Sequence, residues 1–312
     1  MVNFDAIIIS TDNAMLNEIK EIPDKAEKIL YTTKNIQLPL NVPYIGMGSS
    51  YFAGMVMYYN AVPIQLARAS EYYNYLSGKK IRDLGVLISQ SGRSSEVIWC
   101  RDLFKKFYAI TNVVKSPLCV ATNLERVFPI LAGTETSSST KTYINTLITL
   151  YNGLGIDPTA AVEILRDKMY DYEIWGREKA ELIYEIMVTK NYKGCYIIGN
   201  GPNIGTAHQA AHILSESTKY PFIGMSVSEY DHGPKETAKD SVVIVIESDG
   251  VSYRRTQKLF ELVEHAGAHV FYYSEKDVSE KLSPITSIIP IDVYDLLPHT
   301  AVSYSKAIYR GI

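Results

Sequence analysis

The sequence is poor in cysteine, and its three cysteines, Cys100, Cys119 and Cys195, are widely spaced without a CxxC pair. That scarcity excludes a disulfide framework and a cysteine-based zinc site, and it is typical of the reducing cytosol. The sequence also lacks an apolar run near the roughly 18 residues that a membrane span requires. Its first residues, MVNFDAIIISTDNAM, lack the basic start of a signal peptide. We therefore expect a cytoplasmic protein with no membrane partner.

Strong charge of either sign is missing as well. The net charge is −3 over 312 residues, with no basic footprint, so nucleic acid is excluded as a partner. The hydrophobic content of 46% and charged content of 21% are typical of a folded globular chain. The length allows one large domain or two of ordinary size.

What the sequence does contain is an alternation of short apolar runs and longer helical patterns. The expected strands are 42–50, 83–92, 117–123 and 127–133, and the expected helices are 51–70, 94–109 and 139–155. This rhythm predicts a parallel, doubly wound α/β sheet.

The pattern then repeats after a linker at Gly153–Ala160. YKGCYIIGNGPNIG matches the segment around NVPYIGMGSS, and DSVVIVIESDG matches LGVLISQSG. We therefore expect an α/β fold of two doubly wound parallel-sheet subdomains in tandem. The expected limits are an N-terminal segment and helix at 1–25, a first domain at 26–158 and a second at 159–312.

Three segments rich in small hydroxyl residues fall at expected strand ends or helix starts: Gly46–Ser50, Ser89–Ser94 and Ser137–Thr140. Ligands of doubly wound sheets bind beyond the carboxyl ends of the strands, where free amides and helix dipoles favour anions. Any one segment alone is better explained as an ordinary helix N-cap, but three together favour a phosphate cradle. The second half carries Asp249 at the corresponding place, so only the first half suits an anion.

His208, His212 and Glu216 are spaced four residues apart on an expected helix, which would align them on one face and admits a metal site. The segment lacks the catalytic glutamate of H-E-x-x-H, because Gln209 occupies that position. We prefer packing of the two histidines against the sheet, and we expect neither a metal nor a cofactor.

Glu216 and His232 are a second candidate pair, since a carboxylate and an imidazole shuttle protons well at neutral pH. His232 stands directly before Gly-Pro, a turn that would hold the backbone rigidly. Each residue alone is more often a surface or structural group, and nothing in the sequence shows that the two meet.

Together these motifs resemble the sugar isomerase (SIS) family of flavodoxin-like domains. The resemblance is strongest to the isomerase half of the glucosamine-fructose-6-phosphate aminotransferases and to the stand-alone glucosamine-6-phosphate deaminases. MLNEIKEIP is similar to M-x-x-E-I-x-E-Q-P, GMGSSY to C-G-T-S-Y, and ISQSGRSSE to I-S-Q-S-G-E-T-A-D. AGTETSSSTK is similar to A-G-P-E-I-G-V-A-S-T-K, and the segment from LSES to DHGP is similar to L-K-E-I-S…G-E-L-K-H-G-P.

The resemblance implies a role for each matching residue. Glu216 would be the base that moves a proton between C1 and C2, and His232 would help to open the sugar ring. The backbone near Ser137 would touch the sugar. The residues that would bind the phosphate are Ser50, Ser89, Gln90, Ser91 and Ser94. In this family the histidine reaches across a dimer interface, so a homodimer with shared sites is implied.

Three departures from the family pattern bear on the reaction, and a fourth difference, at Arg93, has no interpretation. We expect no glutaminase domain ahead of the first motif, so glutamine would not be the nitrogen donor. Ile213 occupies the position of a family lysine, and Arg93 that of a glutamate. The family's C-terminal lysine tail has no clear match here, although an alternative alignment makes Lys306 that lysine.

The expected function is a phosphosugar aldose–ketose isomerase or deaminase acting on a hexose or hexosamine 6-phosphate. The first reaction to consider is glucosamine 6-phosphate to fructose 6-phosphate plus ammonia. Two alternatives stay open: isomerisation of glucose, mannose or fructose 6-phosphate, and a non-catalytic module that senses phosphosugars.

Overall fold

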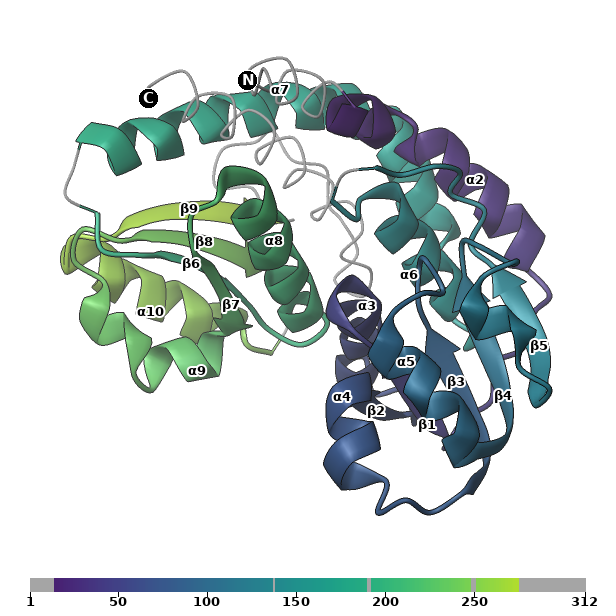
Figure 1. Ribbon diagram of the computed structural model, residues 1–312. Coiled ribbons are helices and arrows are strands. Elements are labelled where there is room, and N and C mark those ends of the chain that lie inside the picture. The colour runs from purple at the N-terminus through teal and green to yellow at the C-terminus, as the bar shows by residue number, and fades with distance from the viewer. Residues whose placement is uncertain (1–13, 137, 190–191, 248–250, 275–312) are drawn as a thin grey trace, which may run out of the picture. The chain divides into compact units, whose positions relative to one another are not determined.

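The computed structural model describes residues 14–136, 138–189, 192–247 and 251–274, and Figure 1 shows their helices and strands. Two compact units emerge from the contacts. The first unit holds residues 24–135 and 139–160. The second unit holds the described parts of 1–23, 136–138 and 161–312. The domain limits expected from the sequence stay a prediction.

The first unit is built on a parallel sheet of five strands in the order β2-β1-β3-β4-β5. The strands are β1 (Pro43–Gly46), β2 (Gln65–Arg68), β3 (Arg82–Ile88), β4 (Phe104–Thr111) and β5 (Leu124–Pro129). The helices are α2 (Ile22–Thr33), α3 (Gly48–Tyr59), α4 (Ala69–Glu71), η1 (Tyr72–Leu76), α5 (Ser95–Trp99), η2 (Cys100–Leu103), η3 (Pro117–Val120) and α6 (Lys141–Gly153).

The second unit has a parallel sheet of four described strands in the order β7-β6-β8-β9. The strands are β6 (Cys195–Gly199), β7 (Phe222–Ser226), β8 (Val242–Glu247) and β9 (His269–Ser274). The helices are α7 (Thr159–Thr189), α8 (Asn203–Thr218), α9 (Val227–Asp231), η4 (Pro234–Thr237) and α10 (Tyr253–His265).

The two sheets share one topology, because in each the first strand lies between the second and the third. This is the flavodoxin-like order, in which the chain reverses direction across the sheet at the first strand. The predicted α/β fold of two parallel-sheet subdomains is therefore confirmed.

Three sequence predictions of elements are wrong. The expected helix 51–70 ends at Tyr59, and its last residues form β2. The expected helix 94–109 ends at Trp99, and Phe104–Thr111 is the strand β4. The expected strand at 117–123 is also wrong, since a short 3-10 helix, η3, occupies Pro117–Val120.

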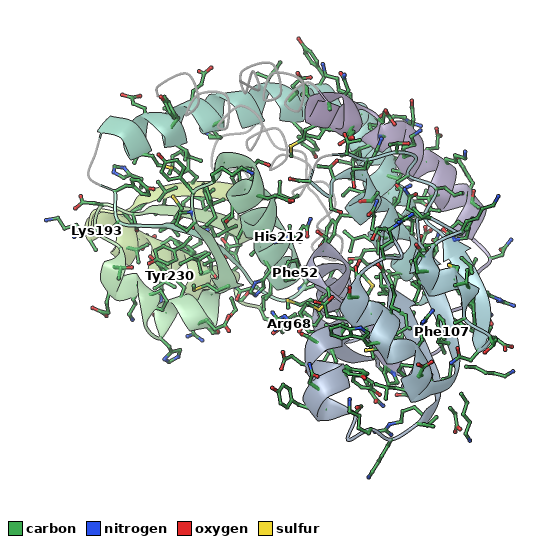
Figure 2. All side chains as sticks on the ribbon, viewed as in Figure 1. Phe52, Arg68, Phe107, Lys193, His212 and Tyr230 are labelled. Atoms are coloured by element: carbon green, nitrogen blue, oxygen red, sulfur yellow. The ribbon has the colours of Figure 1, made fainter. Side chains whose placement is uncertain are left out.

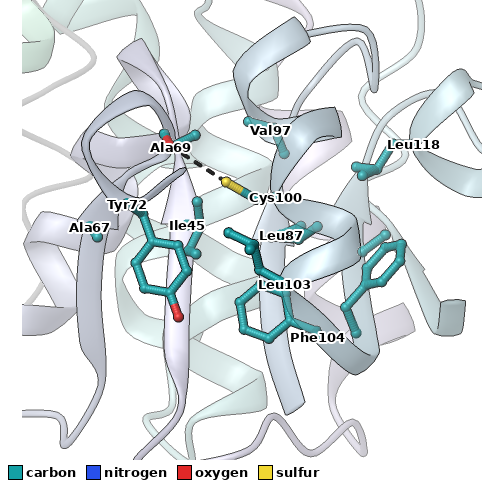
Figure 3. Packing of buried hydrophobic residues seen from close by; sticks show 12 residues of the cluster. Ile45, Ala67, Ala69, Tyr72, Leu87, Val97, Cys100, Leu103, Phe104 and Leu118 are labelled. Carbon is teal, nitrogen blue, oxygen red and sulfur yellow. Dashed lines mark hydrogen bonds between the residues drawn. The ribbon is translucent and has the colours of Figure 1, made fainter. Parts of the chain in front are cut away.

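Buried side chains on both sides of β3 hold the first unit together. In the cluster of Figure 3, the rings of Tyr72 and Phe104 stack with centroids 5.9 Å apart. The thiol of Cys100 donates to the carbonyl of Ala69 over 3.5 Å, and burial raises the pKa of Cys100 to about 12. This cysteine therefore acts as a small apolar side chain, and all three cysteines are free thiols.

Candidate functional site

The carboxyl edge of the first sheet brings two of the predicted segments together. Gly46, at the end of β1, pairs in register with Ile88, at the end of β3. Ser50 lies in the first turn of α3, directly after β1, and Ser89 follows β3 without an intervening residue. Because the chain reverses direction at β1, this is the edge where doubly wound sheets bind ligands.

The loop after β3 is held in one conformation by its own hydroxyls and backbone. The hydroxyls of Ser89 and Ser94 lie 3.1 Å apart, and Ser89 is only 2% exposed. The amide of Ser89 donates to the carbonyl of Ile110 over 3.0 Å, and that of Gly92 donates to the carbonyl of Ser89 over 3.1 Å. The loop is therefore ordered before any ligand arrives.

Gly92 shows why this loop needs a glycine. Its φ of +60° is unfavourable for other residues, and a β-carbon there would stand 1.9 Å from the hydroxyl oxygen of Ser116. The carbonyl of Gly92 accepts the amide of Leu118 over 3.0 Å. The loop after β3 thus packs against the loop after β4 and is hydrogen-bonded to it.

The predicted hydroxyls do not act as helix caps. Met47 occupies the N-cap position of α3, Ser94 that of α5 and Thr140 that of α6, and none of the three side chains caps its helix. By contrast, Ser226 forms a complete capping box at the start of α9. Among the described residues the hydroxyl of Ser50 also has no hydrogen-bond partner. The N-cap explanation considered from the sequence is therefore wrong for this set.

Gln90 lines a pocket of about 680 Å³ in the first unit. The backbone carbonyl of Gln90 accepts a hydrogen bond from the amide of Asn112 over 3.0 Å. Lys25, Lys28 and Lys115 also line this pocket. These three lysines make this part of the edge basic.

The segment before α6 is organised by Glu135, which the sequence analysis did not single out. Its carboxylate accepts the amide and the hydroxyl of Thr140, over 2.9 and 3.0 Å, and the amide and hydroxyl of Thr142. Burial raises the pKa of Glu135, and these hydrogen bonds oppose the rise. The start of α6 is thus fixed by the buried carboxyl group of Glu135, whose pKa is raised.

Ser137, the predicted sugar contact, lies outside the described residues. Its neighbours belong to the second unit. Thr136 donates its amide and hydroxyl to the buried carboxylate of Glu18, over 2.6 and 2.9 Å. The hydroxyl of Ser138 lies 3.3 Å from that of Ser217, the residue after Glu216. Ser138 therefore lies beside the end of α8 that carries the predicted base.

Glu216 lies near the end of α8 and is exposed to solvent. The helix packs tightly on β7, since a β-carbon on Gly224 would stand 2.6 Å from the carbonyl oxygen of Ala207. Ile213, at the position of the family's lysine, is fully buried in this packing. Because its side chain is aliphatic, it cannot donate a proton.

His232 directly follows α9 and is also exposed. Its amide donates to the carbonyl of Ser228 over 3.1 Å, and Gly233 and Pro234 then lead into η4. No hydrogen bond or ion pair joins His232 to Glu216 among the described residues. The structure places both on the second unit without bringing their side chains together.

The expected packing of the two histidines of α8 against the sheet is wrong, because His212 is exposed and His208 is partly exposed. The buried face of the helix consists instead of small and aliphatic residues such as Ala207, Ala211 and Leu214. Within the described ranges, no group of three or more His, Cys, Asp or Glu side chains could hold a metal ion. None of the described helices combines the length and the apolar character that crossing a bilayer requires.

Arg68, the last residue of β2, is a basic group at the same edge that the sequence analysis missed. Its guanidinium carbon lies 4.5 Å from the centre of the Tyr51 ring. It was missed because the sequence placed it inside a helix, where no edge of a sheet is implied. Recognition of β2 would have pointed to it.

Known proteins support the resemblance drawn from the motifs. The chain is 27% identical to a glutamine–fructose-6-phosphate aminotransferase of Pyrococcus horikoshii, over 96% of this chain and 53% of the relative. In fold it is similar to the C-terminal domain of glucosamine-fructose-6-phosphate aminotransferase from Francisella tularensis, with a TM-score of 0.74, 20% identity and 96% of both chains covered. The predicted resemblance to the SIS family is confirmed.

The fold is also similar to that of a glucosamine-6-phosphate deaminase from Thermotoga maritima, with a TM-score of 0.71, 21% identity and 95% of both chains covered. No model of a protein family matches the chain. The chain spans about half the length of the curated relatives it matches.

Proposed function

We propose that this chain binds a hexose 6-phosphate and catalyses an aldose–ketose shift. The preferred reaction is glucosamine 6-phosphate plus water to fructose 6-phosphate plus ammonia. The observation that carries the proposal is the set of hydroxyls at the carboxyl ends of β1 and β3, which the helices do not use as caps. The similarity to the aminotransferases and to the deaminase supports the choice of substrate. A cytosolic location remains a prediction.

Phosphate binding is the proposed task of the first unit. Hydroxyls and backbone amides at the start of a helix can hold an anion without reorganising, because they are already fixed by the fold. The amides of Ser89 and Gly92 fix the loop by donating to the carbonyls of Ile110 and Ser89, so the side chains of the loop are the groups proposed to contact the anion. The proposed phosphate ligands are Ser50, Ser89, Gln90, Ser91 and Ser94. Ser137 is proposed to contact the sugar through its backbone.

Proton transfer is the proposed task of Glu216 and His232. His232 would protonate the ring oxygen and take the proton that the C1 hydroxyl loses, which gives the open-chain aldehyde, and it would return this proton to O1 as Glu216 acts on C2. Glu216 would take the proton from C2 to form an enolamine and return it to C1. The resulting C2 imine adds water and releases ammonia, which leaves the ketone of fructose 6-phosphate. Each step is a proton transfer or hydrolysis, so atoms balance without a redox partner.

A binding module without turnover is the second candidate. The observation that favours it is Ile213, since a fully buried isoleucine replaces a residue that could carry a proton. Isomerisation of a hexose 6-phosphate that has no amino group is a third candidate function of the same site. The enzyme reading is preferred because both Glu216 and His232 are present and exposed.

An assay of purified protein against hexose and hexosamine 6-phosphates, with detection of ketose and of ammonia, separates these readings. We expect ketose and ammonia in equal amounts from glucosamine 6-phosphate, and no ammonia from glutamine. Ketose from glucose 6-phosphate alone would identify a plain isomerase. Binding of several phosphosugars with turnover of none would identify a sensor and contradict the proposed reaction.

A homodimer with shared sites is part of the proposal, and mixed dimers test it. Glu216→Gln and His232→Asn chains are each expected to be inactive alone. If each site takes its glutamate and histidine from different subunits, a mixed dimer regains one complete site, and an equal mixture recovers about one quarter of wild-type activity. Inactivity of mixtures that contain mixed dimers would show that both residues come from one chain.

A further inference from the structure

Arg68 lies close to the proposed phosphate cradle by the register of the sheet. It pairs with Gly46, which pairs on its other side with Ile88, the residue before the serine loop. Neighbouring strands are roughly 5 Å apart, so its Cα stands about 10 Å from that of Ile88. An extended arginine side chain covers most of this distance.

Tyr51 directs the guanidinium of Arg68 toward the start of α3. The guanidinium carbon lies 4.5 Å from the ring centre of Tyr51, which directly follows Ser50. The ring of Tyr51 also meets that of Phe52, with centroids 6.0 Å apart, and Figure 2 labels both Arg68 and Phe52. A cation held over an aromatic ring keeps its N–H groups free at the rim to bind another partner.

The charge of Arg68 is unbalanced within the part of the chain that the structure describes, since no carboxylate pairs with it there. The adjacent start of α3 adds positive potential, because Met47 provides no side-chain cap and helix N-termini are positive. An anion at this point would satisfy the arginine, the helix and the Ser50 hydroxyl together.

We propose that Arg68 is a direct ligand of the anionic group that the loops after β1 and β3 hold, so that the cradle binds a phosphate dianion through charge as well as through hydroxyls. The inference rests on the proposed function and names a residue that the motifs of the family did not. A charged hydrogen bond of this kind corresponds to about 10-fold or more in affinity.

Calorimetric titration of fructose 6-phosphate and of inorganic phosphate tests this inference. Arg68→Ala is expected to weaken binding of both probes about 10-fold or more, and Arg68→Lys by less. Affinity of the wild type should fall with added salt more steeply than that of Arg68→Ala.

Arg126→Ala is the matched control, because this exposed arginine on β5 also lies over aromatic rings, 5.9 Å from the centre of Tyr108 and 5.8 Å from that of Phe128. It should bind as the wild type does. Tyr51→Leu, which frees the guanidinium without removing it, should weaken binding by an intermediate amount.

The outcomes distinguish a failure of the proposed role of Arg68 from a failure of the proposed function. Equal binding by the wild type and Arg68→Ala would overturn the role of Arg68 and leave the proposed function standing. Absence of phosphosugar binding by the wild type itself would overturn both. An equal loss in Arg68→Ala and Arg126→Ala would show a general effect of net charge, which contradicts direct contact.

Discussion

The two units share one sheet order but differ in the polar side chains at the carboxyl edge. At that edge of the first sheet the groups are neutral hydroxyls: that of Ser50 has no hydrogen-bond partner among the described residues, and those of Ser89 and Ser94 lie 3.1 Å apart. At the same edge of the second sheet, polar groups bind one another. Asn200 donates to the hydroxyl of Thr256 over 2.8 Å, and Gln257 donates to the buried carboxylate of Glu247 over 2.6 Å. The repeated fold thus carries neutral hydroxyls at one edge and a buried carboxylate, Glu247, at the other, while α8 and α9 of the second unit carry the proposed acid–base groups.

The largest expected effect comes from the second unit. Glu216→Gln should lower turnover of the preferred substrate about 10²- to 10⁴-fold, because the base that moves the proton is lost. Binding of fructose 6-phosphate should stay unchanged. Glu261→Gln removes an exposed glutamate of α10 in the same unit and should leave turnover intact. Equal rates in the wild type and Glu216→Gln would end the assignment of this residue as the base.

The next largest effect belongs to the first unit. Ser89→Ala combined with Ser91→Ala should weaken binding of fructose 6-phosphate about 10- to 100-fold, since two hydrogen bonds to a charged group are lost. The comparison variant in the second unit, Thr256→Val in α10, should leave binding unchanged. Titration of both variants measures the contrast. A similar loss from Thr256→Val would remove the functional difference between the two edges.

A pair of glycine variants compares the rigidity of the two edges. Gly92 and Gly201 have similar φ angles of +60° and +54°, but only the β-carbon added at Gly92 meets a neighbour, the side chain of Ser116. Gly92→Ala should lower the free energy of unfolding by about 3 kcal/mol, from left-handed strain together with overpacking. Gly201→Ala should cost only about 1 to 2 kcal/mol. Denaturant unfolding measures both, and equal losses would show that the contact with Ser116 is easily relieved.

The smallest expected effect concerns Glu135 at the start of α6. Burial raises the pKa of this carboxyl above its ordinary value of 4.5. Its contribution to stability is therefore complete below that value and is lost as the pH rises through the raised pKa. Glu135→Gln cannot ionise, so the wild type should lose stability relative to this variant on going from pH 4 to neutral pH. A constant difference between the two across this range would contradict the raised pKa.

The sequence was sufficient to predict the fold class and the positions of the serine loop, Glu216 and His232 in their elements. The apolar runs that form β1, β3, β6 and β8 are short, buried and followed by glycine or hydroxyl residues, which is the pattern that such strands favour. The tandem repeat was visible for the same reason.

Other features depended on tertiary context. β2 has one buried residue, Ala67, and in β4 two exposed lysines follow the buried Phe104, so their apolar spacing was misread as helical. The exposure of His212 could not be predicted either, because alanines on the opposite face of α8 form the contact with the sheet. The roles of Arg68 and Glu135 follow from strand register and from hydrogen bonds across several residues, which no local pattern shows.

The most direct test of the account is calorimetric titration of fructose 6-phosphate into three proteins: the wild type, Glu216→Gln and the Ser89→Ala, Ser91→Ala double variant. We predict equal affinity for the first two and a loss of about 10- to 100-fold for the third. Equal affinity for all three, or no binding by the folded wild type, would contradict the assignment of the phosphate cradle to the first unit.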